Sequence, residues 1–252
     1  MIRKPFTILA GLLLGLALLP SATSADSGPE AVLAGLSEQG KYTFLLFYRD
    51  TGPATKALDQ ALANELARCT DRAGGARVAV TDPAAKSLVQ KLGISRAPMP
   101  MVVALAPNGA ITGMFAKKLT AEMVDGAFVT PGMMESMKAL QEKKLVLIRV
   151  ASRNAPEQLP AAVTSLGADP RYKGRVALVS IAVDDEQEQR FRKELELADD
   201  QIQGTVVALL APPGVLVGKF SPNASVAEIT AKLEAAGKCC DDPNCKHVKQ
   251  GK

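Results

Sequence analysis

The chain has 252 residues, of which 47% are hydrophobic and 22% charged, and its formal net charge at pH 7 is +4. Because the basic residues are spread along the chain and nearly balanced by acidic ones, the charge gives no basis for binding nucleic acid or an acidic membrane surface. The length suits one large domain or two of ordinary size, either of which can bury a core without cysteine staples.

Residues 1–25 have the three-part layout of a secretory signal. A basic start is followed by an apolar run, Phe6–Leu19, and then by small residues that end at Ala25. An uncleaved membrane anchor is the alternative, but this run is short for crossing a bilayer. We therefore expect an exported protein, periplasmic or secreted, that is not membrane-embedded after signal cleavage.

An internal repeat organises the remainder of the chain. The segment "LAPNGAITGMF" (Leu105–Phe115) aligns with "LAPPGVLVGKF" (Leu210–Phe220) at a constant offset of 105, with six of eleven positions identical. Both copies follow a strand-like apolar run and precede the start of a helix. Two similar domains in tandem are the simplest explanation.

The first half predicts the order β-α-β-α-β-β-α. Apolar runs, helical spacing and turn residues give these elements in chain order: a strand Tyr42–Tyr48, a helix Gly52–Arg68, a strand 76–81, a helix Ala84–Leu92 capped by Asp82, a strand 101–106, a turn at Asn108 and Gly109, a strand 110–115, and a helix from Thr120.

The second half predicts the same order. Its elements are a strand Leu145–Val150, a helix around Glu157–Leu166, a strand Val176–Val183, a charged helix Asp185–Leu197, a strand from Thr205, a turn at Pro213 and Gly214, and a helix that opens at Ser225 and runs to Ala236. Between the halves, Thr130–Lys144 is typical of a helix with Thr130 as its cap and Pro131 at its first position.

The fold class is therefore α/β, with a central mixed sheet flanked by helices in each domain. We expect a signal peptide at 1–25, a first domain at 26–129, a connecting helix at 130–143, a second domain at 144–237 and a tail at 238–252.

This order of elements, together with "LGISRAPMPMVVALAPNGAI", resembles the thioredoxin-like superfamily. The resemblance implies that Pro100 is the cis-proline that precedes the third core strand in that family. In the second copy Thr205 occupies the matching position, so the resemblance implies that the cis-proline is lost there.

The family's active-site cysteine pair is missing from both halves. Members of the family carry it at the start of the first helix, where the helix dipole and free amides lower the pKa of the thiol. Here Gly52 and Thr55 stand at the two positions, and "ASRNAP" in the second half has no cysteine either. A hydroxyl nucleophile at Thr55 would need a neighbouring base, and the lone His247 lies in the tail. We therefore predict no catalysis at either helix start.

The residues around Pro100 are candidates for a partner-binding face. Met99 and Met101 flank the proline, and Thr55 lies at the facing helix start; a Met-lined surface adapts to varied protein or peptide partners. Thioether ligands for Cu(I) and simple core filling are the alternatives for the methionines. Cys69, at the end of the first helix, is typical of a small buried hydrophobe, or it could pair with a tail cysteine.

The tail contains "KCCDDPNCKH", with Cys239, Cys240, Cys245 and His247. Its Pro-Asn turn would bring three sulfurs and one imidazole within reach of Zn(II) or Cu(I), and these are the only cofactors that the sequence suggests. A disulfide across the turn is an equal alternative in an oxidising compartment. A thiol-disulfide oxidoreductase that uses these tail cysteines is the alternative function.

Overall fold

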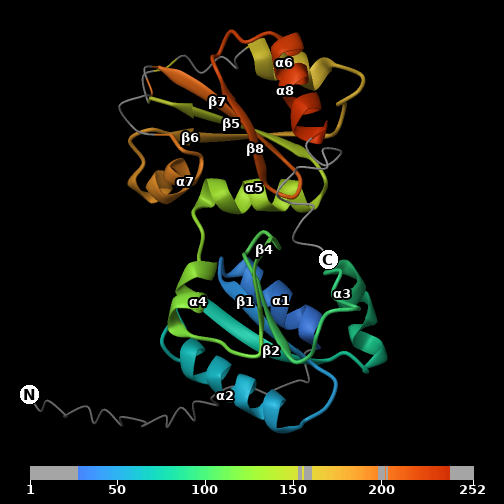
Figure 1. The fold of residues 1–252 in the computed structure, drawn as a ribbon. Helices are drawn as coiled ribbons and strands as arrows, with labels where there is room; N and C mark the ends of the chain where they lie inside the picture. Colours follow the sequence, from blue (N-terminus) through green and yellow to red (C-terminus); the bar gives the residue numbers. More distant parts are fainter. Residues whose placement is uncertain (1–27, 153–154, 156–160, 198–201, 203, 239–252) are drawn as a thin grey trace, which may run out of the picture.

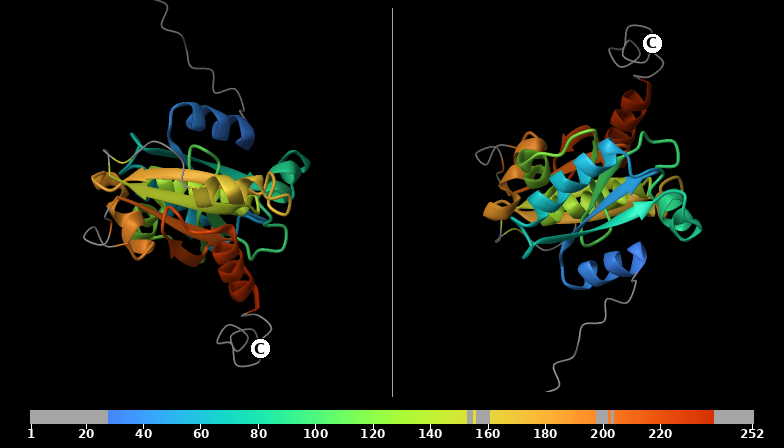
Figure 2. Two further views of the ribbon diagram at one scale, coloured as in Figure 1. Left: turned by 90° about the horizontal axis from the view of Figure 1, so that it is seen from above. Right: turned by 90° about the horizontal axis from the view of Figure 1, so that it is seen from below.

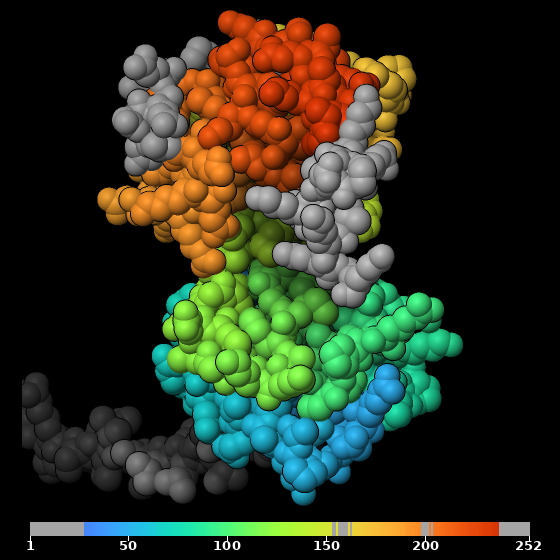
Figure 3. All heavy atoms as spheres, viewed as in Figure 1, coloured from blue at the N-terminus to red at the C-terminus, as the bar shows by residue number. Residues whose placement is uncertain are grey.

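The computed structural model describes residues 28–152, 155, 161–197, 202 and 204–238. Within them the chain forms two units, each built on one four-stranded mixed sheet (Figure 1). The atoms of the two units form two lobes that meet near helix α5 (Pro131–Gln141) (Figure 3). Among the described residues, no helix has the length and apolar character needed to cross a bilayer.

The first unit has the strand order β2-β1-β3-β4, in which β1 and β2 are parallel and the other neighbours are antiparallel. Its elements are α1 Pro29–Glu38, β1 Tyr42–Tyr48, α2 Pro53–Leu66, β2 Ala73–Ala79, the short 3₁₀ helix η1 Pro83–Ala85, α3 Lys86–Lys91, β3 Met101–Leu105, β4 Ile111–Ala116 and α4 Ala121–Ala127.

The second unit repeats this topology with the order β6-β5-β7-β8. Its elements are α5 Pro131–Gln141, β5 Leu145–Ala151, α6 Ala161–Ala168, β6 Val176–Ala182, the 3₁₀ helix η2 Glu186–Glu188, α7 Gln189–Glu194, β7 Thr205–Ala211, β8 Val215–Phe220 and α8 Val226–Lys238. Helices α1 and α8 lie on opposite sides of the molecule (Figure 2).

Helices cover both faces of the first sheet and create two cores. Alternate residues of β1 point to opposite faces, so Phe44 and Leu46 pack with α2 and α4, while Leu45 and Phe47 pack with α1 and α3. All four side chains are fully buried. The continuous apolar run of β1 is therefore explained by its burial on both faces.

The caps that the sequence predicts are present. The side chains of Asp82, Thr120 and Thr130 each accept a hydrogen bond from a main-chain N–H in the first turn of the following helix. The hydroxyl of Ser225 accepts one from the N–H of Glu228 at 3.2 Å. These bonds satisfy donors that a helix start leaves free, which fixes where each helix begins.

Two features of the first unit differ from the sequence prediction. Helix α1 was not expected, and strand β2 begins at Ala73, ahead of the predicted start at residue 76. Gly75 explains the second difference, because a Cβ at this position would lie 2.7 Å from the carbonyl oxygen of Phe44. The glycine therefore belongs to a strand that approaches its neighbour closely, and not to a connection.

Helix α5 takes the same place in the second unit that α1 takes in the first. Each helix packs on the first two strands of its own sheet. In addition, α5 contacts the β3–β4 hairpin: the side-chain amide of Asn108 donates to the carbonyl of Met134 at 3.0 Å, and Gln141 both donates to and accepts from the main chain of Ile111. Helix α5 therefore packs on the second sheet and also contacts the first unit.

Candidate functional site

The start of α2 is shaped by a turn just after strand β1. Asp50 accepts a hydrogen bond from the N–H of Gly52 at 2.8 Å, Gly52 caps the helix, and Pro53 is its first residue. Thr55 lies in the first turn and is 7% exposed. The two positions that would carry cysteines in the family thus hold a cap glycine and a buried hydroxyl.

The bond between Met99 and Pro100 is cis, as the resemblance implies for this position. Beside it lies a cavity of about 220 Å³ that also reaches α2. Its walls come from both segments: Arg49, Asp50, Thr55, Ala97, Pro98, Met99 and Pro100. The fold therefore brings three of the four predicted face residues to one cavity, and we call this cavity the Pro100 site.

Met101 is the exception among the predicted face residues. It is 3% exposed and pairs with Phe47 in the β1–β3 ladder, with its side chain in the core between the sheet and α3. Successive side chains of a strand point to opposite faces, and here the face that Met101 takes is covered by helices. Met101 therefore packs the core and does not contribute a side chain to a partner-binding surface.

Arg49, Asp50, Ala97 and Pro98 are site residues that the sequence reasoning did not name. Each lies within a few residues of a motif that was recognised, either the helix start or the proline. Proximity to those motifs in sequence was the signal that could have identified them.

The chemistry of the Pro100 site does not support thiol or nucleophilic catalysis. No thiol lies at the start of α2, and the N–H of Gly52 already donates a hydrogen bond to the Asp50 carboxylate. The only histidine of the chain, His247, lies outside the described residues. A hydroxyl such as that of Thr55 is a weak nucleophile without an adjacent base.

A second cavity of about 160 Å³ adjoins the Pro100 site and shares Thr55 with it. On its wall Arg77 donates two hydrogen bonds to the Asp59 carboxylate, from Nε at 2.7 Å and from Nη2 at 2.5 Å. Lys56 lies on the same wall and is exposed. Both cavities therefore lie beside the first turn of α2.

The main chain of Met99 is available for binding. Within the described residues, neither its N–H nor its C=O has a hydrogen-bond partner. The matching residue of the second unit, Gly204, accepts a hydrogen bond from the N–H of Ser152 at 3.2 Å. Thr205, which matches Pro100, pairs with Ala151 inside the β5–β7 ladder. The carbonyl of Gly204 thus accepts a hydrogen bond within the second unit, whereas the matching carbonyl of Met99 accepts none within the described residues.

Cys69 lies just beyond the end of α2, at the opposite end of the helix from Thr55. Its thiol has no disulfide partner within the described residues, the residue is 9% exposed, and the thiol donates to the carbonyl of Glu65 at 3.5 Å. Burial raises the pKa of this thiol above its ordinary value, which favours the protonated, less nucleophilic form. Pairing of Cys69 with a tail cysteine concerns residues outside the described range and stays a prediction.

The four tail residues proposed as metal ligands or disulfide partners, Cys239, Cys240, Cys245 and His247, lie outside the described residues. Over the described part of the chain, no group of three or more His, Cys, Asp or Glu side chains is arranged to hold a metal ion. The tail assignments therefore stay predictions.

No protein-family model and no curated protein sequence matches the chain. Among solved structures, a disulphide isomerase from Xylella fastidiosa Temecula1 is 21% identical over 42% of this chain and 91% of its own, with a TM-score of 0.32. The NTD_N/C domain of alkylhydroperoxide reductase AhpF from Enterococcus faecalis is 16% identical over 82% and 99%, with a TM-score of 0.30.

The first two thioredoxin domains of Eps1p from Saccharomyces cerevisiae are 13% identical over 81% of this chain and 96% of their own, with a TM-score of 0.31. We assign the fold from the two sheets themselves: each has two parallel strands and an antiparallel hairpin, with the connectivity that the resemblance implies. The chain forms two tandem thioredoxin-like domains, and the helix start of the first has no cysteine.

Proposed function

We propose that the protein is an exported, non-catalytic thioredoxin-like binding protein. In this proposal the Pro100 site of the first domain holds an extended segment of a protein partner. The proposed export rests on the signal-like residues 1–25. The proposed absence of catalysis rests on Gly52 and Thr55, which stand at the positions of the family's cysteines.

The observation that carries the proposal is the free main chain of Met99 beside a cavity of about 220 Å³. A strand-like donor and acceptor at the edge of a cavity can pair with the backbone of an extended peptide, while the cavity receives a side chain. Pro98 and Pro100, on either side of Met99, have no N–H of their own. Met99 therefore supplies the main-chain N–H of this Pro-Met-Pro segment.

A titration of the mature protein with a labelled, unfolded polypeptide tests the proposal. The probe is fluorescein-labelled, carboxymethylated insulin B chain, read by fluorescence anisotropy. Pro98 is exposed and lines the cavity, so Pro98→Trp should fill the site and weaken binding by about tenfold or more, which corresponds to ~1.4 kcal/mol or more. Pro98→Ala is the matched control and should bind as the unaltered protein does. Equal binding by all three proteins would refute the assignment to this site.

The tail supports a second proposal about the same protein. We propose that Cys239, Cys240, Cys245 and His247 bind a soft metal, Cu(I) or Zn(II), or that the cysteines form a structural disulfide. Metal content that is unchanged when the chain is cut after Gly237 would remove the metal from this account. A native protein without free tail thiols would favour the disulfide.

The alternative function is thiol-disulfide exchange by the tail cysteines. An insulin-reduction assay separates it from binding alone. Activity that is lost when Cys239, Cys240 and Cys245 are changed to Ser would establish the oxidoreductase, whereas absence of activity in the unaltered protein supports the non-catalytic proposal.

A further inference from the structure

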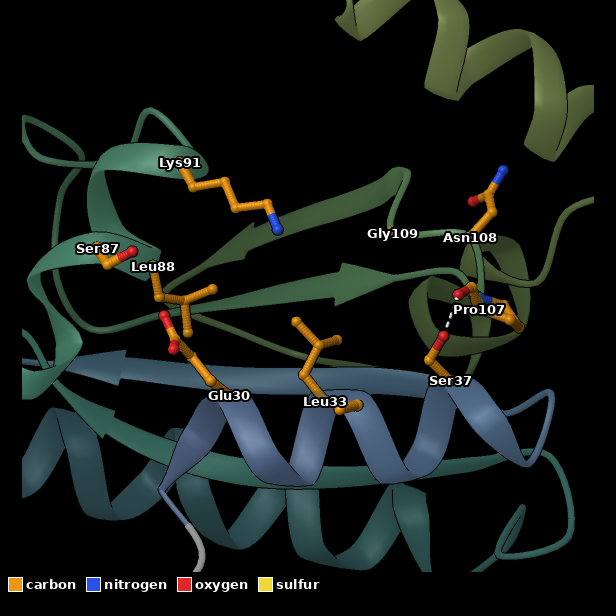
Figure 4. A pocket seen from close by; sticks show the side chains of 10 residues that line it. Glu30, Leu33, Ser37, Ser87, Leu88, Lys91, Pro107, Asn108 and Gly109 are labelled. Atoms are coloured by element: carbon orange, nitrogen blue, oxygen red, sulfur yellow. Dashed lines mark hydrogen bonds between the residues drawn. The ribbon is translucent and has the colours of Figure 1, made fainter.

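A larger cavity lies on another part of the first domain, between helices α1 and α3. It measures about 540 Å³ and is bounded by side chains of both helices and by the β3–β4 turn (Figure 4). Leu33 from α1 extends into the space between the helices, and Glu30 and Lys91 reach it from opposite helices. Leu88 of α3 also borders this space, but its side chain is only 2% exposed. We call this space the α1–α3 groove.

The internal repeat shows what fills the same space in the second domain. The turns after α1 and α5 match at an offset of 103: Lys41 N–H donates to Leu36 O at 2.9 Å, and Lys144 N–H donates to Ala139 O at 3.0 Å. The groove residues Glu30, Ala34 and Ser37 therefore correspond to Met133, Met137 and Leu140.

In the second domain these larger side chains close the space. Met133, Leu140 and Phe191 of α7 are buried in one core, and Met137 packs against it. In contrast, no residue of α1 is buried. Helix α1 presents glutamate, alanine and serine where α5 presents two methionines and a leucine, although Leu33 is larger than its counterpart Ser136. The free volume beside Ala34 and Ser37 can therefore accommodate apolar side chains.

The charges at the groove suggest how a ligand is oriented. Over the described part of the chain, neither Glu30 nor Lys91 takes part in an ion pair. A carboxylate on one helix and an ammonium on the other complement a molecule with a positive and a negative end. In the same groove, Leu33 and Pro107 offer an apolar surface.

We propose that the α1–α3 groove binds a short peptide that has free ends and apolar side chains. Its ammonium group faces Glu30, its carboxylate faces Lys91, and its side chains cover Leu33 and Pro107. The volume lies in the range of pockets that enclose small ligands, roughly 300–1,000 Å³. This site is separate from the Pro100 site, and its ligand is independent of the partner proposed there.

Isothermal titration of the mature protein with the tripeptide Met-Ala-Leu tests the proposal. Ala34 is exposed and lines the groove, so Ala34→Met places in it the side chain that the second domain carries at that position. We expect this change to weaken binding by about tenfold or more. Ala31→Met adds the same side chain at an exposed α1 position outside the groove and should leave the affinity unchanged. Both variants keep a good helix former on α1, and circular dichroism confirms folding.

The results that overturn the proposal are equally specific. Absence of saturable binding by the unaltered protein refutes it, as does equal binding by the Ala34→Met protein. Binding that Pro98→Trp abolishes would place the tripeptide in the Pro100 site and would also refute it.

Capped peptides test the two charges separately. We expect acetylation of the amino end to weaken binding about two- to fivefold, as the loss of one exposed ion pair does, and Glu30→Gln should erase this difference. Amidation of the carboxyl end should act in the same way, with Lys91→Met erasing the difference. Equal affinities of free and capped peptides for the unaltered protein would overturn the assigned orientation and with it the proposal.

Discussion

Thr205 pairs with Ala151 inside the β5–β7 ladder, whereas Pro100, its counterpart in the repeat, stands ahead of the β1–β3 ladder. The residues that precede them, Gly204 and Met99, differ in their main-chain hydrogen bonds. Gly204 accepts a hydrogen bond from Ser152, and Met99 keeps its main chain free within the described residues. Two domains with one topology therefore present different edges, and in the first a cavity lies at this position.

Introducing the family's cysteine pair should give the first domain a thiol activity at the start of α2. We predict that Gly52→Cys with Thr55→Cys confers insulin reduction, because both positions lie at the amino end of α2, where free amides and the helix dipole stabilise a thiolate. A Cβ at position 52 would lie 2.8 Å from an oxygen of Asp50, and this carboxylate would oppose the thiolate. Adding Asp50→Ala should therefore raise the activity further.

The matched control for this prediction is Gly52→Ser with Thr55→Ser, which should remain inactive. The tail cysteines are changed to Ser in all of these proteins, so that only the grafted thiols are measured. A grafted protein that folds, forms the disulfide and still fails to reduce insulin would contradict the assignment of these two positions.

Tyr42 connects β1 to the segment that leads to α5. Its hydroxyl donates to Val129 O at 3.1 Å and accepts from Val129 N–H at 3.2 Å. We predict that Tyr42→Phe lowers the free energy of unfolding by about 1–2 kcal/mol, because a typical hydrogen bond contributes ~0.5–1.5 kcal/mol. The ring contact with Phe128 would be kept. Urea unfolding measures the change, and unaltered stability would contradict the role of the hydroxyl.

The same residue should give a dependence on alkaline pH. Burial raises the pKa of Tyr42 above its ordinary value of 10.0, in spite of the opposing hydrogen bond from Val129 and the charge of Arg72. The stability that the neutral phenol contributes is present below pH 10 and is lost as the pH rises through the raised pKa of the folded state. Tyr42→Phe should remove this loss from a series of unfolding curves above pH 9.

Gly132 is needed for the contact between α5 and η2. Its N–H donates to Glu188 Oε1 at 2.6 Å, and a Cβ there would lie 2.6 Å from a methyl of Ile181. We predict that Gly132→Ala destabilises the protein by about 1–3 kcal/mol through overpacking. Gly126→Ala is the control in helix α4, where a Cβ meets nothing within 4 Å. It should stabilise by roughly 0.5–1 kcal/mol, and equal effects of the two changes would contradict this explanation.

Cys69 should react slowly in the folded protein. Its pKa is raised above the ordinary value of 9.0, mainly by burial, and only the thiolate reacts with iodoacetamide. In a protein with the tail cysteines changed to Ser, we predict alkylation at pH 8 that is roughly tenfold slower or more in buffer than in denaturant. Mass spectrometry follows the reaction. Equal rates would show that the thiol is accessible and reactive.

Much of the fold could be predicted from the sequence because its signals are local. The apolar run Tyr42–Tyr48 identifies a strand buried on both faces, and Asp82, Thr120 and Thr130 mark helix starts through their side chains. The repeat at Leu105–Phe115 and Leu210–Phe220 predicts two similar domains, and the structure has two sheets of the same order.

The features that were missed depend on tertiary contacts. Helix α1 has no fully buried residue, and its place in the fold depends on the contacts that it makes with strands β1 and β2. The position of Met101 in the core follows from the helices that cover its face of the sheet. The hydrogen-bonding of Met99 and Gly204 depends on the segments beside them, which sequence patterns do not resolve.

The most direct test of binding at the Pro100 site is a map of amide chemical shifts. The ¹⁵N-labelled mature protein is titrated with unlabelled, carboxymethylated insulin B chain. We predict that the amide shifts of Met99, Thr55 and Arg49 change together and saturate, while those of Gly204 and Ser152 in the second domain stay constant. Shifts that leave Met99 and Thr55 unchanged at saturation would contradict peptide binding at this site.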